Sequence, residues 1–129
     1  MKASNLACWS TLLLLLLPMP SWSDCDTPHV CSDVSTSLKG SIVGSNVVIE
    51  WDTDSEGTDL GHYEIYRFDC ANPQCLVYVD SVSPTGTCNQ NEPYLVEDTP
   101  PSPVSSWTYQ VRVIKKTGST QCSINVEPE

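Results

Sequence analysis

The chain has 129 residues, of which 16 are acidic and 6 are basic, so its formal net charge is −10 at pH 7. This charge repels nucleic acids and anionic membranes, and both are therefore excluded as partners. We interpret it as an acidic surface that keeps a protein dispersed, with the binding of a cationic partner as the alternative.

Residues 1–23 are expected to be a secretory signal peptide. Lys2 is the lone positive charge of this segment, Leu12 to Leu17 form an apolar run, and small residues at Ser21 and Ser23 suit cleavage near Ser23. The apolar run is shorter than the roughly 20 residues of a membrane helix, and no second run follows. The chain is therefore expected to be secreted or periplasmic, with no membrane span.

Six of the seven cysteines lie beyond residue 23. An even number of cysteines in an exported chain predicts disulfides. Zinc ligation is less favoured, because the spacing C-x2-C is absent and only two histidines are available. Three disulfides and no metal or cofactor are expected, from Cys25, Cys31, Cys70, Cys75, Cys88 and Cys122.

The remainder of the chain alternates apolar and polar residues with the period of a β-strand, and no segment shows a helical period. Strands are expected at residues 35–43, 46–51, 62–67, 76–80, 94–97, 107–113 and 119–126. The first and last of these have weaker patterns and are expected to be outer strands. The inward positions predict a core of Val47, Ile49, Trp51, Tyr63, Ile65, Tyr109, Val111 and Val113.

An acidic loop, DTDSEGTD, occupies residues 52–59. Its carboxylates and its glycine match positions one, three, five and six of a helix-loop-helix calcium site. Position twelve of such a site should be a bidentate glutamate and is Tyr63 instead. A solvated acidic turn between two strands is therefore expected. Weak surface binding of calcium is the alternative, with Asp52, Asp54, Glu56 and Asp59 as candidate ligands.

No catalytic residues are expected. His29 lies in the N-terminal tail and His62 at the start of a strand, and neither belongs to a nucleophile motif such as G-x-S-x-G. The carboxylates are numerous, but a sandwich of strands offers no obvious cleft in which two of them would flank a substrate. The sequence therefore predicts that the chain is not an enzyme.

Several motifs, in this order and spacing, resemble a fibronectin type III domain of the variety common in bacterial secreted proteins. They are Trp51, Gly61–Arg67, Tyr94–Thr99, Tyr109–Val113 and Gly118. The resemblance covers roughly residues 33–126 and leaves 24–32 and 127–129 as tails. It implies an all-β, immunoglobulin-like sandwich of seven antiparallel strands in two sheets, stapled by disulfides. Trp51 would lie in the core, and Tyr109 would brace the corner before the sixth strand. The cysteines and the segment 100–103 depart from the family.

The strand order implied by this resemblance limits the disulfide pairing. The turn that holds Cys70 and Cys75 would lie at one pole of the sandwich, and the other four cysteines at the opposite pole. Cys70 would then pair with Cys75. The favoured pairs at the other pole are Cys31 with Cys122 and Cys25 with Cys88, and the rival pairs are Cys25 with Cys31 and Cys88 with Cys122.

Two functions are consistent with these features. The first is a secreted module, expected to be a monomer, that has a structural role or binds an extracellular or periplasmic protein through its loops or an exposed sheet edge. The alternative is a small disulfide-rich inhibitor or effector that presents the loop from Cys70 to Cys75.

Overall fold

The computed structural model describes residues 29–69, 75–85 and 91–129. In chain order, the described residues form α3 (Val30–Ser37), β1 (Lys39–Val43), β2 (Asn46–Thr53), β3 (Leu60–Phe68), β4 (Val77–Val82), β5 (Glu92–Asp98), the 3-10 helix η2 (Val104–Ser106), β6 (Thr108–Lys115) and β7 (Thr120–Val126). None of the helices in this part of the chain is long and apolar enough to cross a membrane. The expected signal peptide lies outside the described residues.

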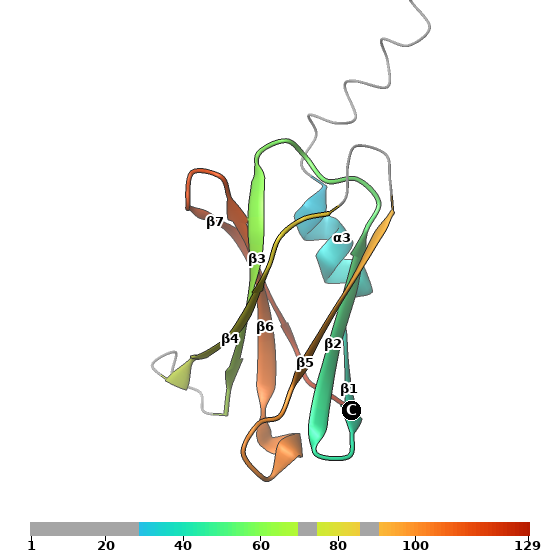
Figure 1. Cartoon of the computed structure of the whole chain (residues 1–129), viewed down its shortest axis with the longest axis vertical. Coiled ribbons are helices and arrows are strands. Elements are labelled where there is room, and N and C mark those ends of the chain that lie inside the picture. Colours follow the sequence, from blue (N-terminus) through green and yellow to red (C-terminus); the bar gives the residue numbers. More distant parts are fainter. Residues whose placement is uncertain (1–28, 70–74, 86–90) are drawn as a thin grey trace, which may run out of the picture.

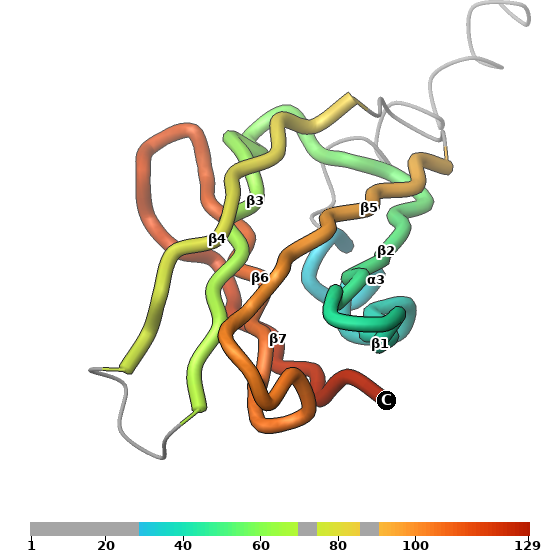
Figure 2. The backbone as a smooth tube through the Cα atoms, turned by 60° about the horizontal axis from the view of Figure 1, so that its bottom comes forward, coloured from blue at the N-terminus to red at the C-terminus, as the bar shows by residue number. Residues whose placement is uncertain are grey.

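The strands form two sheets, and every pair is antiparallel. One sheet has the order β1-β2-β5 and the other the order β4-β3-β6-β7. Figure 1 shows the two sheets side by side, and Figure 2 shows β4, β3, β6 and β7 on one side with β5, β2 and β1 on the other. The predicted all-β, two-sheet sandwich is confirmed.

The core lies between the inner faces of the two sheets. Register aligns Tyr63 with Val113 and Ile65 with Val111, so inward side chains of neighbouring strands meet on the same face. No residue of the expected core is more than 2 % exposed: Val47, Ile49, Trp51, Tyr63, Ile65, Tyr109, Val111 and Val113. Leu60, Tyr94 and Val96 belong to the same cluster.

The helix α3 overturns the expectation that the chain contains no helix. It occupies Val30–Ser37, where the sequence predicted the end of a tail and, from Ser35, an outer strand; β1 begins only at Lys39. Val30 and Val34 lie one helical turn apart and are buried in the core. Valine, serine and threonine are weak helix formers, so contacts with β2 and β7 must stabilise this helix.

The last residue of α3, Ser37, forms hydrogen bonds with the backbone of β2 beyond the end of β1. The hydroxyl of Ser37 accepts a hydrogen bond from the backbone N–H of Asp52 (3.0 Å) and donates one to the C=O of the same residue (2.9 Å). Ser37 thus takes the place of the strand partner that β1, beginning at Lys39, does not supply. A second contact follows, in which the N–H of Asp54 donates to the Asp33 carboxylate (3.0 Å).

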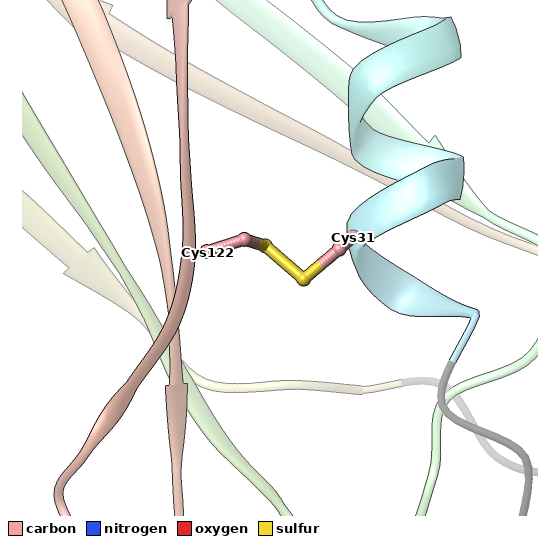
Figure 3. Close-up of a disulfide and its surroundings, with 2 residues drawn as sticks. All are labelled: Cys31 and Cys122. Carbon is pink, nitrogen blue, oxygen red and sulfur yellow. A yellow bond between two sulfur atoms is a disulfide. The ribbon is translucent and has the colours of Figure 1, made fainter.

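A disulfide joins α3 to the last strand. Cys31 and Cys122 are bonded with their Cα atoms 6.1 Å apart and 91 residues between them in sequence (Figure 3). This is the favoured pairing at that pole, and it excludes the rival bond from Cys31 to Cys25. Cys75 is also in a disulfide. Cys25, Cys70 and Cys88 lie outside the described residues, so their pairing stays a prediction.

Two of the edge strands of the sandwich, β1 and β7, are in contact with the terminal segments of the described chain. The C-terminal residues, expected to form a tail, run beside β1 (Figure 1), where Ile42 N–H donates to the C=O of Glu129 (2.9 Å) and Glu129 N–H to the C=O of Gly40 (3.2 Å). The edge strand β7 is tied to α3 at one residue, through the disulfide. Of these two strands, β1 is therefore the one whose edge is covered by backbone hydrogen bonds.

The other two edge strands are interrupted. In β5, Pro93 lacks a backbone N–H and cannot donate to an added strand. In β4, the register with β3 shifts beside Val79, and the carboxylate of Asp80 accepts the N–H of Ser81 (2.8 Å). Prolines, bulges and charges of this kind are common protections against edge-to-edge pairing.

Candidate functional site

The strand β3 carries a tyrosine–glutamate contact on each of its two faces. On the inner face, Tyr63 contacts Glu56; on the outer face, Tyr66 contacts Glu64. The inner cluster comprises Trp51, Glu56, Tyr63 and Tyr94. The outer cluster comprises His62, Glu64, Tyr66, Tyr78, Gln110, Arg112 and Asn125.

The inner cluster holds a buried carboxylate. Glu56 is only 5 % exposed, and its carboxylate accepts hydrogen bonds from the hydroxyls of Tyr63 (2.5 Å) and Tyr94 (2.6 Å). The two tyrosine rings pack against Trp51, with centroids 5.2 and 5.4 Å from the Trp51 ring. The acidic loop is therefore not a solvated turn at Glu56, because this side chain anchors the loop to the core.

The environment of the inner cluster keeps both tyrosines protonated. Burial raises the pKa of Tyr63 well above its ordinary value, and the hydrogen bond to Glu56 adds to the rise. The pKa of Tyr94 is raised in the same way, by burial first and then by the Glu56 contact. Both hydroxyls are thus hydrogen-bond donors at neutral pH, as the Glu56 carboxylate requires.

The candidate calcium ligands are divided among different contacts. Glu56 faces the core, Asp54 Oδ1 accepts from the side-chain amide of Asn91 (3.2 Å), and the C=O of Asp59 accepts from the N–H of Lys116 (2.8 Å). Within residues 29–69, 75–85 and 91–129, no three His, Cys, Asp or Glu side chains are grouped so as to hold a metal ion. The structure therefore does not bring these carboxylates together.

The outer cluster lies across all four strands of its sheet. Register places Tyr78, Tyr66, Gln110 and Asn125 in one row from β4 to β7, with Glu64 and Arg112 paired in the next row. Adjacent strands lie about 4.8 Å apart, so the row is about 14 Å wide. These side chains therefore share the outer face of the four-stranded sheet.

Contacts between side chains fix the geometry of the outer cluster. The guanidinium carbon of Arg112 lies 4.3 Å from the Tyr66 ring centroid, and the Tyr78 ring meets Tyr66 edge-on at 5.8 Å. The Nε of Arg112 donates to Gln110 Oε1 (2.7 Å), whose Nε2 donates to Asn125 Oδ1 (3.0 Å). These contacts order an arginine and two amides that would otherwise rotate freely.

Glu64 is the acidic centre of the outer cluster. One carboxylate oxygen accepts from the Tyr66 hydroxyl (2.8 Å), and the other lies 2.9 Å from His62 Nε2. The pKa of Glu64 is lowered, mainly by the contact with His62 and then by that with Tyr66. Glu64 is therefore an acceptor whose two oxygens are already engaged.

A third polar group links the two sheets near the end of β5. The Nη1 of Arg67 lies 2.9 and 2.8 Å from the two carboxylate oxygens of Asp98, and the Tyr109 hydroxyl donates to the same carboxylate (2.6 Å). Trp107 covers the Arg67 guanidinium at 5.2 Å. Burial, followed by the Asp98 contact, raises the pKa of Tyr109. Tyr109 thus joins the sixth strand to the end of the fifth.

The outer face of the three-stranded sheet carries a shallow groove of about 390 Å³. Its walls combine charges of both signs, Lys39 and Glu50, with the exposed side chain of Leu95. Among the described residues, the side chains of Lys39, Glu50 and Leu95 form no hydrogen bonds like those of the outer cluster. The groove is thus a second outward-facing surface of the protein, on the other sheet.

The sequence did not identify the outer cluster as a site. A signal was present, because His62, Glu64 and Tyr66 alternate with the inward residues of β3, and Gln110 and Arg112 do the same on β6. Alternation gives the face on which each side chain lies, but not which strands are neighbours. Only the strand order places Arg112 over Tyr66.

Neither the family models nor the curated proteins contain a match to this sequence. Solved structures that are similar include pectate lyase PelI from Erwinia chrysanthemi in complex with tetragalacturonic acid, with 16 % identity, a TM-score of 0.46, and 70 % of this chain and 26 % of that chain covered. Pectate lyase Pel3 from Pectobacterium carotovorum has 12 % identity and a TM-score of 0.49, with 72 % and 26 % covered. The chain thus spans about a quarter of the length of these structures.

These similar structures concern the prediction that the chain is not an enzyme. They are named as pectate lyases, which are enzymes, so the prediction that the chain is not an enzyme is contradicted and is withdrawn. With TM-scores below 0.5 and such low identities, the likeness assigns neither an activity nor a substrate to this chain.

Proposed function

We propose that this chain is a secreted fibronectin type III-like module that binds another protein. The strand order supports the family: β4 pairs with β3 in the four-stranded sheet, whereas the immunoglobulin constant arrangement puts the fourth strand beside the fifth. The Tyr109 hydroxyl supports it as well, because it braces the end of β5 from the start of β6. Here its acceptor is the Asp98 side chain, whereas a tyrosine corner uses a backbone acceptor.

The observation that carries the binding function is the ordered outer cluster on the outer face of the four-stranded sheet. Tyrosine and arginine are enriched among the residues that dominate protein interfaces. Their fixed geometry lowers the entropy lost when a partner binds. Because β1 is covered and β4 and β5 are interrupted, we place the contact on this face instead of on a sheet edge.

Site-specific photo-crosslinking tests this function. A photoreactive phenylalanine analogue replaces Tyr78 in the outer cluster or, as the matched control, Leu95 over the groove; both positions are exposed, at 55 and 56 %. Exposure to the native extracellular fluid should give a protein adduct from position 78 and none from position 95. The purified adduct partner must then bind the unmodified chain reversibly. The function is wrong if neither position yields a partner that binds the unmodified chain.

Secretion needs a separate measurement. The chain should be recovered from the periplasm or the medium with an N-terminus close to residue 24. Recovery only from the cytoplasm, with residues 1–23 intact, would contradict this part of the proposal. The alternative role as an inhibitor depends on the loop from Cys70 to Cys75, which lies largely outside the described residues and stays a prediction.

A further inference from the structure

The hydrogen-bonding groups of the outer cluster differ in whether they have a partner within it. Each carboxylate or amide acceptor has one internal partner: both oxygens of Glu64, Oε1 of Gln110 and Oδ1 of Asn125. Among the described residues, Arg112 donates only through Nε, which leaves its terminal N–H groups to solvent. The terminal N–H groups of Arg112 are therefore the donors that this face offers to a partner.

The position of Arg112 makes its free groups suited to one chemistry. Its position over the Tyr66 ring and the Nε contact with Gln110 restrain the guanidinium, and its terminal N–H groups are restrained with it. A planar pair of donors matches the two oxygens of a carboxylate. Tyr78, which is 55 % exposed beside Tyr66, adds an apolar contact next to this position.

The charge of the whole chain limits the protein that can bring the carboxylate. A net charge of −10 repels an acidic macromolecule at distances within the screening length and attracts a basic one. A basic surface that carries one carboxylate would be attracted by the net charge of this chain and would also supply the acceptor for Arg112. The basic surface would provide the long-range attraction, and the contact with Arg112 would fix how the partner is aligned on the outer cluster.

We propose that the outer cluster is the docking surface for a basic protein that presents an Asp or Glu side chain to Arg112 and an apolar side chain to Tyr78. This inference rests on the proposed protein-binding function and names its site and the chemistry of its partner.

Selection from a library of random 12-residue peptides displayed on phage tests the inference with the full, disulfide-bonded chain as target. The enriched peptides should share an acidic residue close to an apolar or aromatic one, in a sequence of net positive charge. A synthetic peptide of the most enriched sequence should lose at least about tenfold in affinity when its acidic residue is changed to the amide.

Variants of the chain then locate the contact. Arg112→Ala and Tyr78→Ala should each weaken the synthetic peptide at least about tenfold, and Arg112→Lys, which keeps the charge but not the planar donor pair, should also weaken it. Leu95→Ala and Glu50→Gln, in the groove of the other sheet, should leave affinity unchanged. Circular dichroism and thermal melting establish that each variant is folded.

The outcomes separate this inference from the proposed function. If the peptides lack an acidic residue, or if the groove variants and not Arg112→Ala abolish binding, the outer cluster is not the site although the chain still binds proteins. If no peptide is enriched and photo-crosslinking also finds no partner, both fail. Binding of tetragalacturonic acid that depends on Arg112, with no binding of the peptide, would overturn the protein partner in favour of a carboxylated saccharide.

Discussion

The two faces of β3 carry the same pair of residue types in different surroundings. Tyr63 donates to Glu56 at 2.5 Å inside the core, whereas Tyr66 donates to Glu64 at 2.8 Å on the surface. The inner pair is enclosed by Trp51 and Tyr94, so disrupting it leaves polar groups without water. The outer pair remains in contact with solvent. The same contact thus stabilises the fold on one face and orders a surface on the other.

Replacing an aromatic residue with alanine is expected to give the largest difference between the two faces in the free energy of unfolding. Trp51→Ala should lower the free energy of unfolding by about 3 to 5 kcal/mol, because it removes a ring that packs on both Tyr63 and Tyr94. Tyr78→Ala, on the outer face, should cost less than about 1 kcal/mol. Urea unfolding followed by circular dichroism measures both. A loss below about 1 kcal/mol for Trp51→Ala would show that the strand register is wrong.

The two glutamates provide the next comparison. Glu56→Ala leaves the hydroxyls of Tyr63 and Tyr94 without this acceptor, and should lower the free energy of unfolding by about 2 to 3 kcal/mol. Glu64→Ala should cost less than about 1 kcal/mol, since water replaces the lost contacts. Guanidinium unfolding at pH 7 measures the difference. Equal losses would mean that Glu56 is not buried in solution.

Alkaline pH should lower the stability of the fold, and most strongly through Tyr63 on the inner face, whose pKa is raised far more than that of Tyr66. The pKa of Tyr63 is raised in the folded state, so below its ordinary value of 10.0 the tyrosine is protonated in both states. Above that pH the unfolded chain releases the proton and the folded chain keeps it, and stability falls by roughly 1.4 kcal/mol per pH unit for each such tyrosine. Tyr63→Phe should remove about one such contribution from the slope between pH 10 and 11, measured by urea unfolding. An unchanged slope would contradict the burial of this hydroxyl.

Calcium should have the smallest effect on the stability of the fold. The inner tyrosines already occupy the Glu56 carboxylate, so the acidic loop has lost a candidate ligand to the core. Thermal melts with millimolar calcium and with chelator should nearly coincide. A rise of more than about 5 °C, which is roughly 1 kcal/mol for a domain of this size, would show that the loop carboxylates do converge on a cation.

Neighbouring residues of the acidic loop show where inference from the sequence stops. Asp54 and Glu56 are both acidic, lie two positions apart and flank the same turn, yet Glu56 is 5 % exposed and Asp54 lies at the surface. A loop has no repeating period to decide which side chains turn inward. Glu56 turns inward because the hydroxyls of Tyr63 and Tyr94 donate to its carboxylate, and Tyr94 is 38 residues distant from Glu56 in sequence.

The sequence by itself determined the core strands and their inward faces, because the residues of the expected core in β2, β3 and β6 follow a local period of two. Only the tertiary structure decided the helix at residues 30–37, the inward turn of Glu56, and the stacking of Arg112 on Tyr66. The first depends on contacts with β2 and β7, the second on tyrosines of both sheets, and the third on which strands are neighbours. These are interactions between segments far apart in sequence, and a local pattern does not record them.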